Sequence, residues 1–270
     1  MKRVPVLVAA MLLASACSTV VQTTGAGEVG VDRQQRMIVS AQEVDAITSN
    51  QYSEVLDGAR QKNLLDTDPF QVARVKGVAQ RLIAQAPTFR PDAAGWAWET
   101  HVIESKELNA WCMPGGKIAV YSALLEKLQL TDAELAAVMG HEMAHALREH
   151  AREKISKSYG ANVLFGVTSA IIGVDISGIG GQGFDLLVGL PNSRAMETEA
   201  DRIGVELMAR AGYDPRAAAN VWMKMNKASQ GDFAPQFLST HPSNRSRIED
   251  MTVYAERVRP LYERASGAKS

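Results

Sequence analysis

The stretch from Thr131 to His150 constrains the fold most strongly, because its pattern predicts one helix that carries two histidines. His141 and His145 are four residues apart, so on a helix their imidazoles lie on the same face. Neutral imidazole nitrogens bind zinc at about 2.0–2.1 Å, and a rigid helix presents the pair without loop entropy. Glu142, the next residue, can reach water on such a metal. The pattern predicts a metal site, and a structural pair of buried histidines is the alternative.

The same stretch is apolar around most of its circumference, as a buried helix is. Thr131-Asp132-Ala133-Glu134 has the pattern of a capping box, which marks the start of the helix. The apolar positions are Leu135, Val138, Met139, Met143, Ala146 and Leu147. Both imidazoles would therefore lie inside the protein, where a polar group needs a partner.

Composition limits the size of the domain and its partners. With 270 residues, 46% of them hydrophobic, and a net charge of −1, the chain can bury one good-sized core. Basic residues cluster only within 148–157, late in the predicted helix, where cations favour the helix dipole; a docking patch is the alternative. The charge argues against nucleic acid as a partner.

The first residues have the pattern of a targeting segment. Lys2-Arg3 precede an apolar run, Val4 to Ala14, that is too short for a resident membrane span. We expect residues 1–16 to be a signal peptide, cleaved before Cys17. The residues up to Cys17 resemble the lipobox of bacterial lipoproteins, and Ser18 resembles the residue of lipoproteins sorted to the outer membrane. This predicts lipidation of Cys17 and an outer-membrane lipoprotein of the bacterial cell envelope that faces the periplasm; ordinary signal peptidase cleavage is the alternative.

The segment after the cleavage site is predicted to be a spacer. Residues 17–35, rich in Thr, Gly, Val and Gln, have no sustained apolar period and are expected to form a flexible tether. The chain has two cysteines, so a lipidated Cys17 leaves Cys112 without an intramolecular disulfide partner. Cys112 is expected to be a strand residue, and pairing with another chain is the alternative.

Two packing helices and a small sheet are expected before the histidine helix. The residues from Met37 to Ala59 and from Asp68 to Ala86 have helical spacing, and Asp68-Pro69 opens the second helix. From Trp96 the apolar period changes to two, which predicts strands over 96–103 and 117–121. The expected fold class is α+β and mostly helical, with a small β-sheet beside the histidine helix.

The residues between these strands are candidates for a substrate-binding edge. Asn109, Pro114, Gly115 and Gly116 mark turns. An extended peptide can add to an exposed strand edge through main-chain hydrogen bonds, which leaves few side-chain constraints. We expect Asn109, Ala110, Gly115 and Gly116 to form this edge.

Two other histidines are expected to have no role as ligands. His101 is a lone histidine in a strand, where a structural role is usual. His150 follows His141 by nine residues, about half a turn out of phase on a continuous helix.

The stretch from Ser158 to Val174 carries no charge over 17 residues. A packed helix followed by a mobile Gly-rich loop near the site is expected, because the run contains polar residues and falls below the roughly 20 residues of a membrane span. A membrane-inserting hairpin is the alternative.

The helical stretch from Arg194 to Ala211 carries the candidates for a third metal ligand. Glu197 and Asp201 are four residues apart and share a face, whereas Glu199 lies about 200° away from Glu197, so only one of the two glutamates can face the metal. A carboxylate ligand with a second carboxylate one turn behind it suits a metal site in which the second orients a ligating imidazole. A solvated acidic turn near a helix N-terminus is the alternative.

His141-Glu142-Met143-Ala144-His145 followed by Glu197-x-x-x-Asp201 is similar to the HtpX-type family of zinc metallopeptidases, which includes CaaX prenyl endopeptidases and mitochondrial Oma-type proteases. Four further places fit this family: Asn109-Ala110, Pro114-Gly115-Gly116, Ser193-Arg194, and Thr240-His241-Pro242 with Arg247 beyond. The match runs from about residue 37 to 260. With the signal peptide and Cys17, the chain most resembles the LoiP-type lipoprotein branch.

The resemblance implies a gluzincin-type domain over 36–262, followed by a disordered tail over 263–270. It implies one zinc per chain on His141, His145 and Glu197. It also implies that Asp201 orients a ligand and that Glu142 is the general base. The expected reaction is hydrolysis of peptide bonds in misfolded or unfolded envelope proteins.

Two further residues, His241 and Arg247, are implied to line the cleft and assist catalysis. In some relatives the histidine of the His-Pro pair holds the fourth zinc position and keeps the enzyme latent, and in others it stabilises the oxyanion. A buried helix-capping role for His241 is a further alternative. The rival function is a zinc-stabilised, chaperone-like lipoprotein that binds envelope proteins. The sequence carries no information on oligomeric state.

Overall fold

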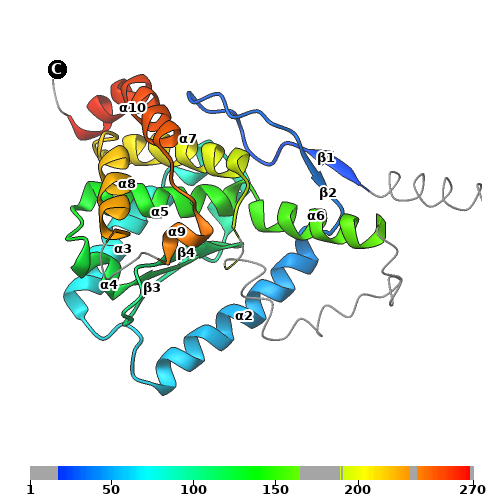
Figure 1. Cartoon of the computed structure of the whole chain (residues 1–270), viewed down its shortest axis with the longest axis horizontal. Helices are drawn as coiled ribbons and strands as arrows, with labels where there is room; N and C mark the ends of the chain where they lie inside the picture. The colour runs from blue at the N-terminus through cyan, green and yellow to red at the C-terminus, as the bar shows by residue number, and fades with distance from the viewer. Residues whose placement is uncertain (1–17, 165–188, 190, 231–235, 268–270) are drawn as a thin grey trace, which may run out of the picture.

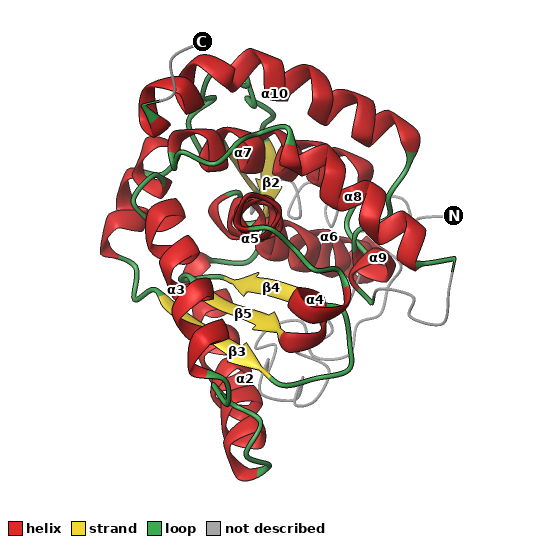
Figure 2. Ribbon diagram, turned by 90° about the vertical axis from the view of Figure 1, so that its left-hand side faces the viewer, coloured by secondary structure: helices red, strands yellow, loops and turns green. Residues whose placement is uncertain are grey.

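Helix α5 (Asp132–Leu147) is the central element: a small sheet packs on one side of it and α7 (Arg194–Arg210) on the other (Figures 1 and 2). The structure, a computed structural model, describes residues 18–164, 189, 191–230 and 236–267. Figure 2 looks nearly along α5 and shows the sheet below it and α7 and then α10 (Arg245–Ser266) above it. The fold is α+β and mostly helical, as predicted.

The remaining elements surround this centre. They are β1 (Thr19–Val21), β2 (Gln35–Met37), α2 (Ala41–Gln61), α3 (Pro69–Ile83), the short 3₁₀ helices Ala86–Thr88 and Pro91–Gly95, α4 (Ser122–Lys127), α6 (His150–Leu164), α8 (Ala217–Ala228) and α9 (Phe237–Thr240). The two expected packing helices are α2 and α3, and Asp68 caps α3 by accepting from the backbone N–H of Phe70 at 2.8 Å.

The capping box predicted at the start of α5 is present. Thr131 Oγ1 accepts from the N–H of Glu134 at 3.2 Å, and Glu134 Oε2 accepts from the N–H of Thr131 at 2.8 Å. Every residue from Glu134 to Leu147 is buried, as the apolar pattern predicts.

The end of this helix differs from the prediction. The helix ends at Leu147 and not at His150, because Glu149 adopts a left-handed conformation with φ +51° and turns the chain before α6 begins. Such a conformation is uncommon for a residue other than glycine, and residue type alone did not predict it.

The sheet consists of β3 (Glu99–Ile103), β5 (Lys117–Tyr121) and β4 (Ala110–Met113) in the order β3-β5-β4. β3 runs parallel to β5, and β4 runs antiparallel to it. The edge strand β4 packs against α5, so the sheet lies beside the histidine helix as expected. Cys112 is a buried residue of this strand, as predicted, and is a free thiol.

Helices α5 and α7 approach each other closely at two glycines. A Cβ atom on Gly204 would lie 2.8 Å from the backbone nitrogen of His141, and one on Gly140 would lie 3.0 Å from the carbonyl oxygen of Gly204. Because real Cβ contacts are longer, only glycine permits this crossing. The crossing brings the acidic turn of α7 next to the histidines of α5.

The segment predicted to be a flexible tether is packed against the domain over its described part, residues 18–35. β1 pairs antiparallel with β2, and Val29 and Val31 are buried in the core. The side chain of Arg33 pairs with Glu153 at 2.8 Å. The prediction was wrong because the strands are three residues long and their partners are remote in sequence.

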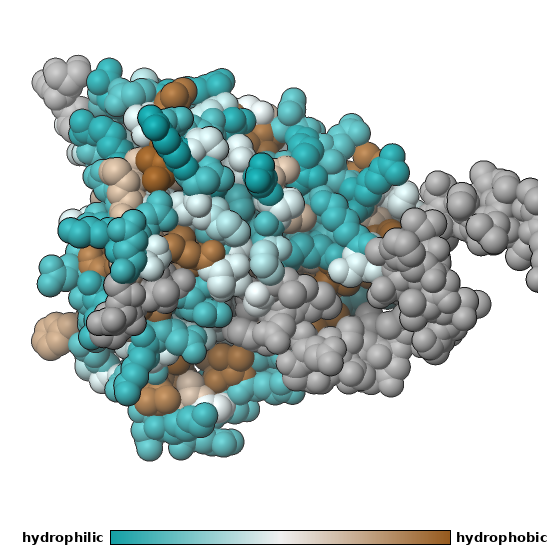
Figure 3. Space-filling view, in the orientation of Figure 1, coloured by the Kyte–Doolittle hydropathy of each residue, from teal (hydrophilic) through white to brown (hydrophobic). Residues whose placement is uncertain are grey.

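The other expectations for the ends of the chain have mixed outcomes. α10 continues to Ser266, so 263–266 are helical and not a disordered tail. The signal peptide and Cys17 lie outside the described residues. The same holds for residues 165–174 of the uncharged run and for the Gly-rich stretch that follows it. Among the described helices, none has the length and apolar character needed to cross a membrane. The face in Figure 3 is mostly hydrophilic, with hydrophobic residues in small separate areas.

Candidate metal centre

Four buried side chains converge on one point and form a group of possible metal ligands, the ligand group. His141 and His145 come from α5, Glu197 from the first turn of α7, and His241 from the end of α9. One ligand atom from each lies within 4.8 Å of the others. His141 Nε2 is 3.0 Å from His145 Nε2 and 3.1 Å from His241 Nδ1.

These atoms fit a zinc ion. Asp201 Oδ1 lies 2.9 Å from His141 Nδ1, and a carboxylate at this distance favours the tautomer with a proton on Nδ1. Nε2 of His141 then keeps a lone pair, which faces the other three side chains. Glu197 Oε1 lies 3.3 Å from His145 Nε2 and 2.9 Å from His241 Nδ1. Nitrogens on a tetrahedral zinc would be about 3.3 Å apart, close to the observed separations. A set of inward-facing nitrogen and carboxylate donors is typical of a zinc site.

Neighbouring charged groups keep the carboxyl groups of Glu197 and Asp201 ionised. Burial alone would raise the pKa of Glu197, but the neighbouring histidines hold this pKa far below its usual range. Burial would also raise the pKa of Asp201, and Arg247 and His141 together lower it. Burial strongly lowers the pKa of His145, which favours the neutral imidazole that a metal needs.

Glu142 lies beside this group. Its Oε1 atom is buried, has no hydrogen-bond partner within the described part of the chain, and lies 3.4 Å from His241 Nε2. Burial raises the pKa of Glu142. The carboxylate lines a cleft between β4 and α5 together with Asn109, Ala110 and His241.

Arg247 is not among the residues that line this cleft, contrary to the expectation. It lies behind the carboxylates: its Nε and Nη2 atoms donate to Asp201 at 2.7 Å each, and Nη1 is 2.8 Å from Glu197 Oε2. Its guanidinium also stacks over the ring of Trp222 at 4.2 Å. The clustered carboxylates need this buried countercharge, which explains why Arg247 faces them and not the solvent.

Residues 69–255 match the sequence model described as peptidase family M48. The chain belongs to peptidase family M48. It is 36% identical over 225 residues to the mitochondrial metalloendopeptidase OMA1 of Schizosaccharomyces pombe, covering 82% of this chain and 60% of the relative. It is 35% identical over 223 residues to the OMA1 of Arabidopsis thaliana, covering 83% and 42%.

A bacterial relative is also similar to this M48 chain. The beta-barrel assembly-enhancing protease of Escherichia coli is 28% identical over 214 residues, covering 75% of this chain and 42% of the relative. The chain spans about half the length of the curated relatives it matches. These matches confirm the predicted family.

Only part of the predicted substrate-binding edge lies at the cleft of this M48 chain. Asn109 and Ala110 line the cleft, whereas Gly115 borders a neighbouring pocket and Gly116 packs under the ring of Trp98. The two glycines have φ of +77° and +84°, so they form the turn after β4 and do not belong to the edge itself. Their role is to let the strand reverse.

Two residues that line the cleft were not predicted to lie there. Lys154 is on α6, and burial lowers its pKa to about 8. His150 also lines the cleft, and its Nδ1 lies 2.7 Å from Nδ1 of His145. His150 is outside the ligand group, and its contact with His145 depends on the left-handed turn at Glu149, which no residue type at that position indicates.

Glu199 and His101 both lie outside the ligand group. Glu199 faces away from Glu197 and contacts His150 at 3.0 Å, so one glutamate of the two reaches the ligand group. His101 pairs with Asp66 at 2.7 Å and stays apart from the group.

Proposed function

We propose that this M48 chain is a zinc-dependent endopeptidase in which His141, His145 and Glu197 hold the metal. The observation that carries the proposal is the convergence of these ligands next to Glu142, a buried carboxylate whose Oε1 atom has no hydrogen-bond partner in the described structure. The curated relatives named as metalloendopeptidases support the same reaction.

The residues of the cleft have separate tasks in this reaction. Zinc, when bound, would supply a Lewis acid that polarises a peptide carbonyl and makes water more acidic. Glu142 takes the proton from the attacking water and passes it to the leaving amine. Burial raises the pKa of Glu142. A carboxyl group whose pKa lies nearer to the working pH can both accept the proton of water and donate it to the amine.

The edge strand β4 suits the binding of an extended peptide. It borders the cleft through Asn109 and Ala110, so a substrate strand paired with it would pass Glu142. Main-chain hydrogen bonds of this kind tolerate many sequences, which fits a protease for misfolded or unfolded proteins.

His241 favours a latent form of the enzyme. Its Nδ1 atom lies within the ligand group, 3.1 Å from His141 Nε2, in a place suited to a fourth ligand. A ligand there would fill the position that water needs. The other role, in which His241 stabilises the oxyanion, requires the ring to leave this position.

Metal removal tests the proposed activity. The full chain should cleave casein, lose this activity on treatment with a chelator, and regain it with zinc. In the same assay His241→Ala should cleave faster than the wild type if His241 holds the site closed, and more slowly if it stabilises the oxyanion. Cleavage that persists after complete removal of metal would contradict the proposal.

We further propose that residues 1–16 are a signal peptide and that Cys17 is lipidated, which places the peptidase domain at the outer membrane, facing the periplasm, in a LoiP-type lipoprotein. The name of the Escherichia coli relative, which refers to beta-barrel assembly, favours envelope proteins as substrates. Mass spectrometry of the chain purified from bacterial membranes should find an acylated N-terminal Cys17. An unmodified Cys17 would contradict the anchor and leave the enzymatic proposal intact.

A further inference from the structure

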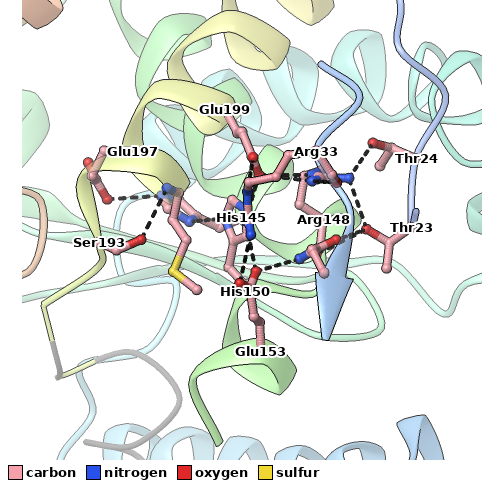
Figure 4. A network of polar contacts seen from close by, with 12 residues as sticks. Thr23, Thr24, Arg33, His145, Arg148, His150, Glu153, Ser193, Glu197 and Glu199 are labelled. Atoms are coloured by element: carbon pink, nitrogen blue, oxygen red, sulfur yellow. Dashed lines mark hydrogen bonds and ion pairs between the residues drawn. The ribbon is translucent and has the colours of Figure 1, made fainter. Parts of the chain in front are cut away.

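A chain of buried polar contacts runs from the outer side of His145, away from the ligand group (Figure 4). Nδ1 of His145 lies 2.7 Å from Nδ1 of His150, and Nε2 of His150 lies 3.0 Å from Oε2 of Glu199. All three side chains are buried. His141 has a carboxylate, Asp201, directly behind it, whereas His145 has a second imidazole and then a carboxylate.

The order of these contacts fixes which atoms carry protons. Glu199 is ionised and can only accept, so His150 must donate from Nε2. A neutral His150 then accepts at Nδ1, and His145 must donate from its own Nδ1. The Nε2 atom of His145 is left with a lone pair that faces Glu197 and His141, as a zinc ligand requires.

Two arginines hold Glu199 in place. Arg148 donates to Oε2 from Nε at 3.1 Å and from Nη2 at 3.0 Å, and its side chain is completely buried. Arg33 donates to Oε1 from Nε and to Oε2 from Nη2 at 3.1 Å. Arg33 lies between β1 and β2, so the N-terminal segment contributes directly to this network.

The backbone is distorted where the network requires it. On a continuous helix His150 would point away from His145, and the left-handed Glu149 brings the two rings together. A residue other than glycine in this conformation is strained, and it persists where the surrounding contacts demand it.

We propose that Glu199, acting through His150 and held by Arg33, is a positioning residue that sets the tautomer and the ring orientation of His145 for metal binding. This inference rests on the proposed zinc site. It gives the N-terminal segment a part in metal affinity, although none of its residues from 18 onward lies in the ligand group.

The test compares zinc affinities of the purified full chain and its variants by competition with a chelator. Glu199→Gln replaces an acceptor by an amide that can also donate, so it no longer dictates the proton positions. The dissociation constant for zinc should rise about 10–100-fold, as is usual for partners behind a ligating histidine.

Glu206→Gln is the matched control. Glu206 is a completely buried carboxylate about two turns further along α7, and it also holds the N-terminal segment, by accepting from the N–H of Val29 at 3.0 Å. It has no contact with the histidines, so its variant should change the dissociation constant by less than about twofold. A similar loss in both variants would overturn the inference, because the effect would then come from the packing of the segment.

A spectroscopic measurement separates positioning from general stability. In the zinc-loaded wild type, ¹H–¹⁵N spectra should show a hydrogen-bonded proton on Nδ1 of His145, and Glu199→Gln should weaken or remove this signal. Should Glu199→Gln fail to fold, Arg33→Gln keeps the contact of Glu199 with His150 and removes one arginine; its zinc affinity should fall by less than that expected for Glu199→Gln.

The outcomes are distinguishable. Unchanged zinc affinity in a folded Glu199→Gln variant, or in a folded Arg33→Gln variant when the first does not fold, would overturn this inference alone. A wild-type chain that binds no zinc would overturn the proposed function together with it.

Discussion

Replacement of Glu142 by glutamine should lower the rate of casein cleavage by about 10²–10⁴-fold, the contribution typical of a general acid–base group. The amide keeps the size of the carboxylate but cannot take a proton from water. Because Glu142 lies outside the ligand group, zinc content and the free energy of unfolding should stay near their wild-type values. The cleavage rate, the metal content and urea unfolding together check this expectation.

Glu134→Gln is the control for this variant. Glu134 is also a buried glutamate of α5, but its Oε2 caps the helix and pairs with Lys224 at 2.7 Å, far along the helix from the metal centre. This variant should lose about 1 kcal/mol of stability and keep its cleavage rate. Near wild-type cleavage by Glu142→Gln would refute the role of Glu142. Capture of unfolded substrate without any cleavage by the wild type would favour the chaperone-like alternative.

Replacement of Arg247 by methionine should destabilise the metal-free chain by about 3–5 kcal/mol, because it leaves Asp201 and Glu197 buried without their countercharge. The guanidinium also donates to the carbonyl oxygen of Pro242 at 2.7 Å, and this contact is lost as well. Urea unfolding in the presence of a chelator measures the effect without a contribution from bound metal.

The structure offers a matched comparison for this variant. Arg202 on α7 pairs with Asp250 on α10 through two hydrogen bonds of 2.9 Å, so it joins the same two helices as Arg247 and Asp201, but both side chains of this pair are partly exposed to solvent. Arg202→Met should cost about 1 kcal/mol or less, because ion pairs that solvent can reach contribute little. Equal losses in the two variants would show that Arg247 serves only as a link between helices.

The parts of the fold that local pattern determines were predictable from the sequence. The capping box at Thr131 and the apolar positions that follow it fixed the start and the burial of α5. The spacing of Glu197 and Asp201 placed both on one face of α7, and the structure brings this face to His141. These features depend on residues within a turn or two of each other, where helical geometry leaves little choice.

The parts that depend on contacts remote in sequence were not predictable. The left-handed Glu149 moves His150 next to His145, and no residue type there signals a turn. The N-terminal segment looked like a spacer because Arg33 finds its carboxylate partners, Glu153 and Glu199, more than 100 residues away. The position of Arg247 likewise became apparent only once the carboxylates it neutralises were known to be buried together.

The packing of β1 and β2 against the domain has a consequence for orientation. If Cys17 carries the proposed acyl chains, Ser18 alone separates the lipid from the first strand, so the domain has little freedom to swivel at the bilayer. The end of the molecule that holds β1 and α6 would face the lipid headgroups (Figure 1). Substrates would then reach the cleft only from directions that the membrane does not block. The direction of access would therefore limit which proteins are cleaved, before any side chain in the cleft contacts them.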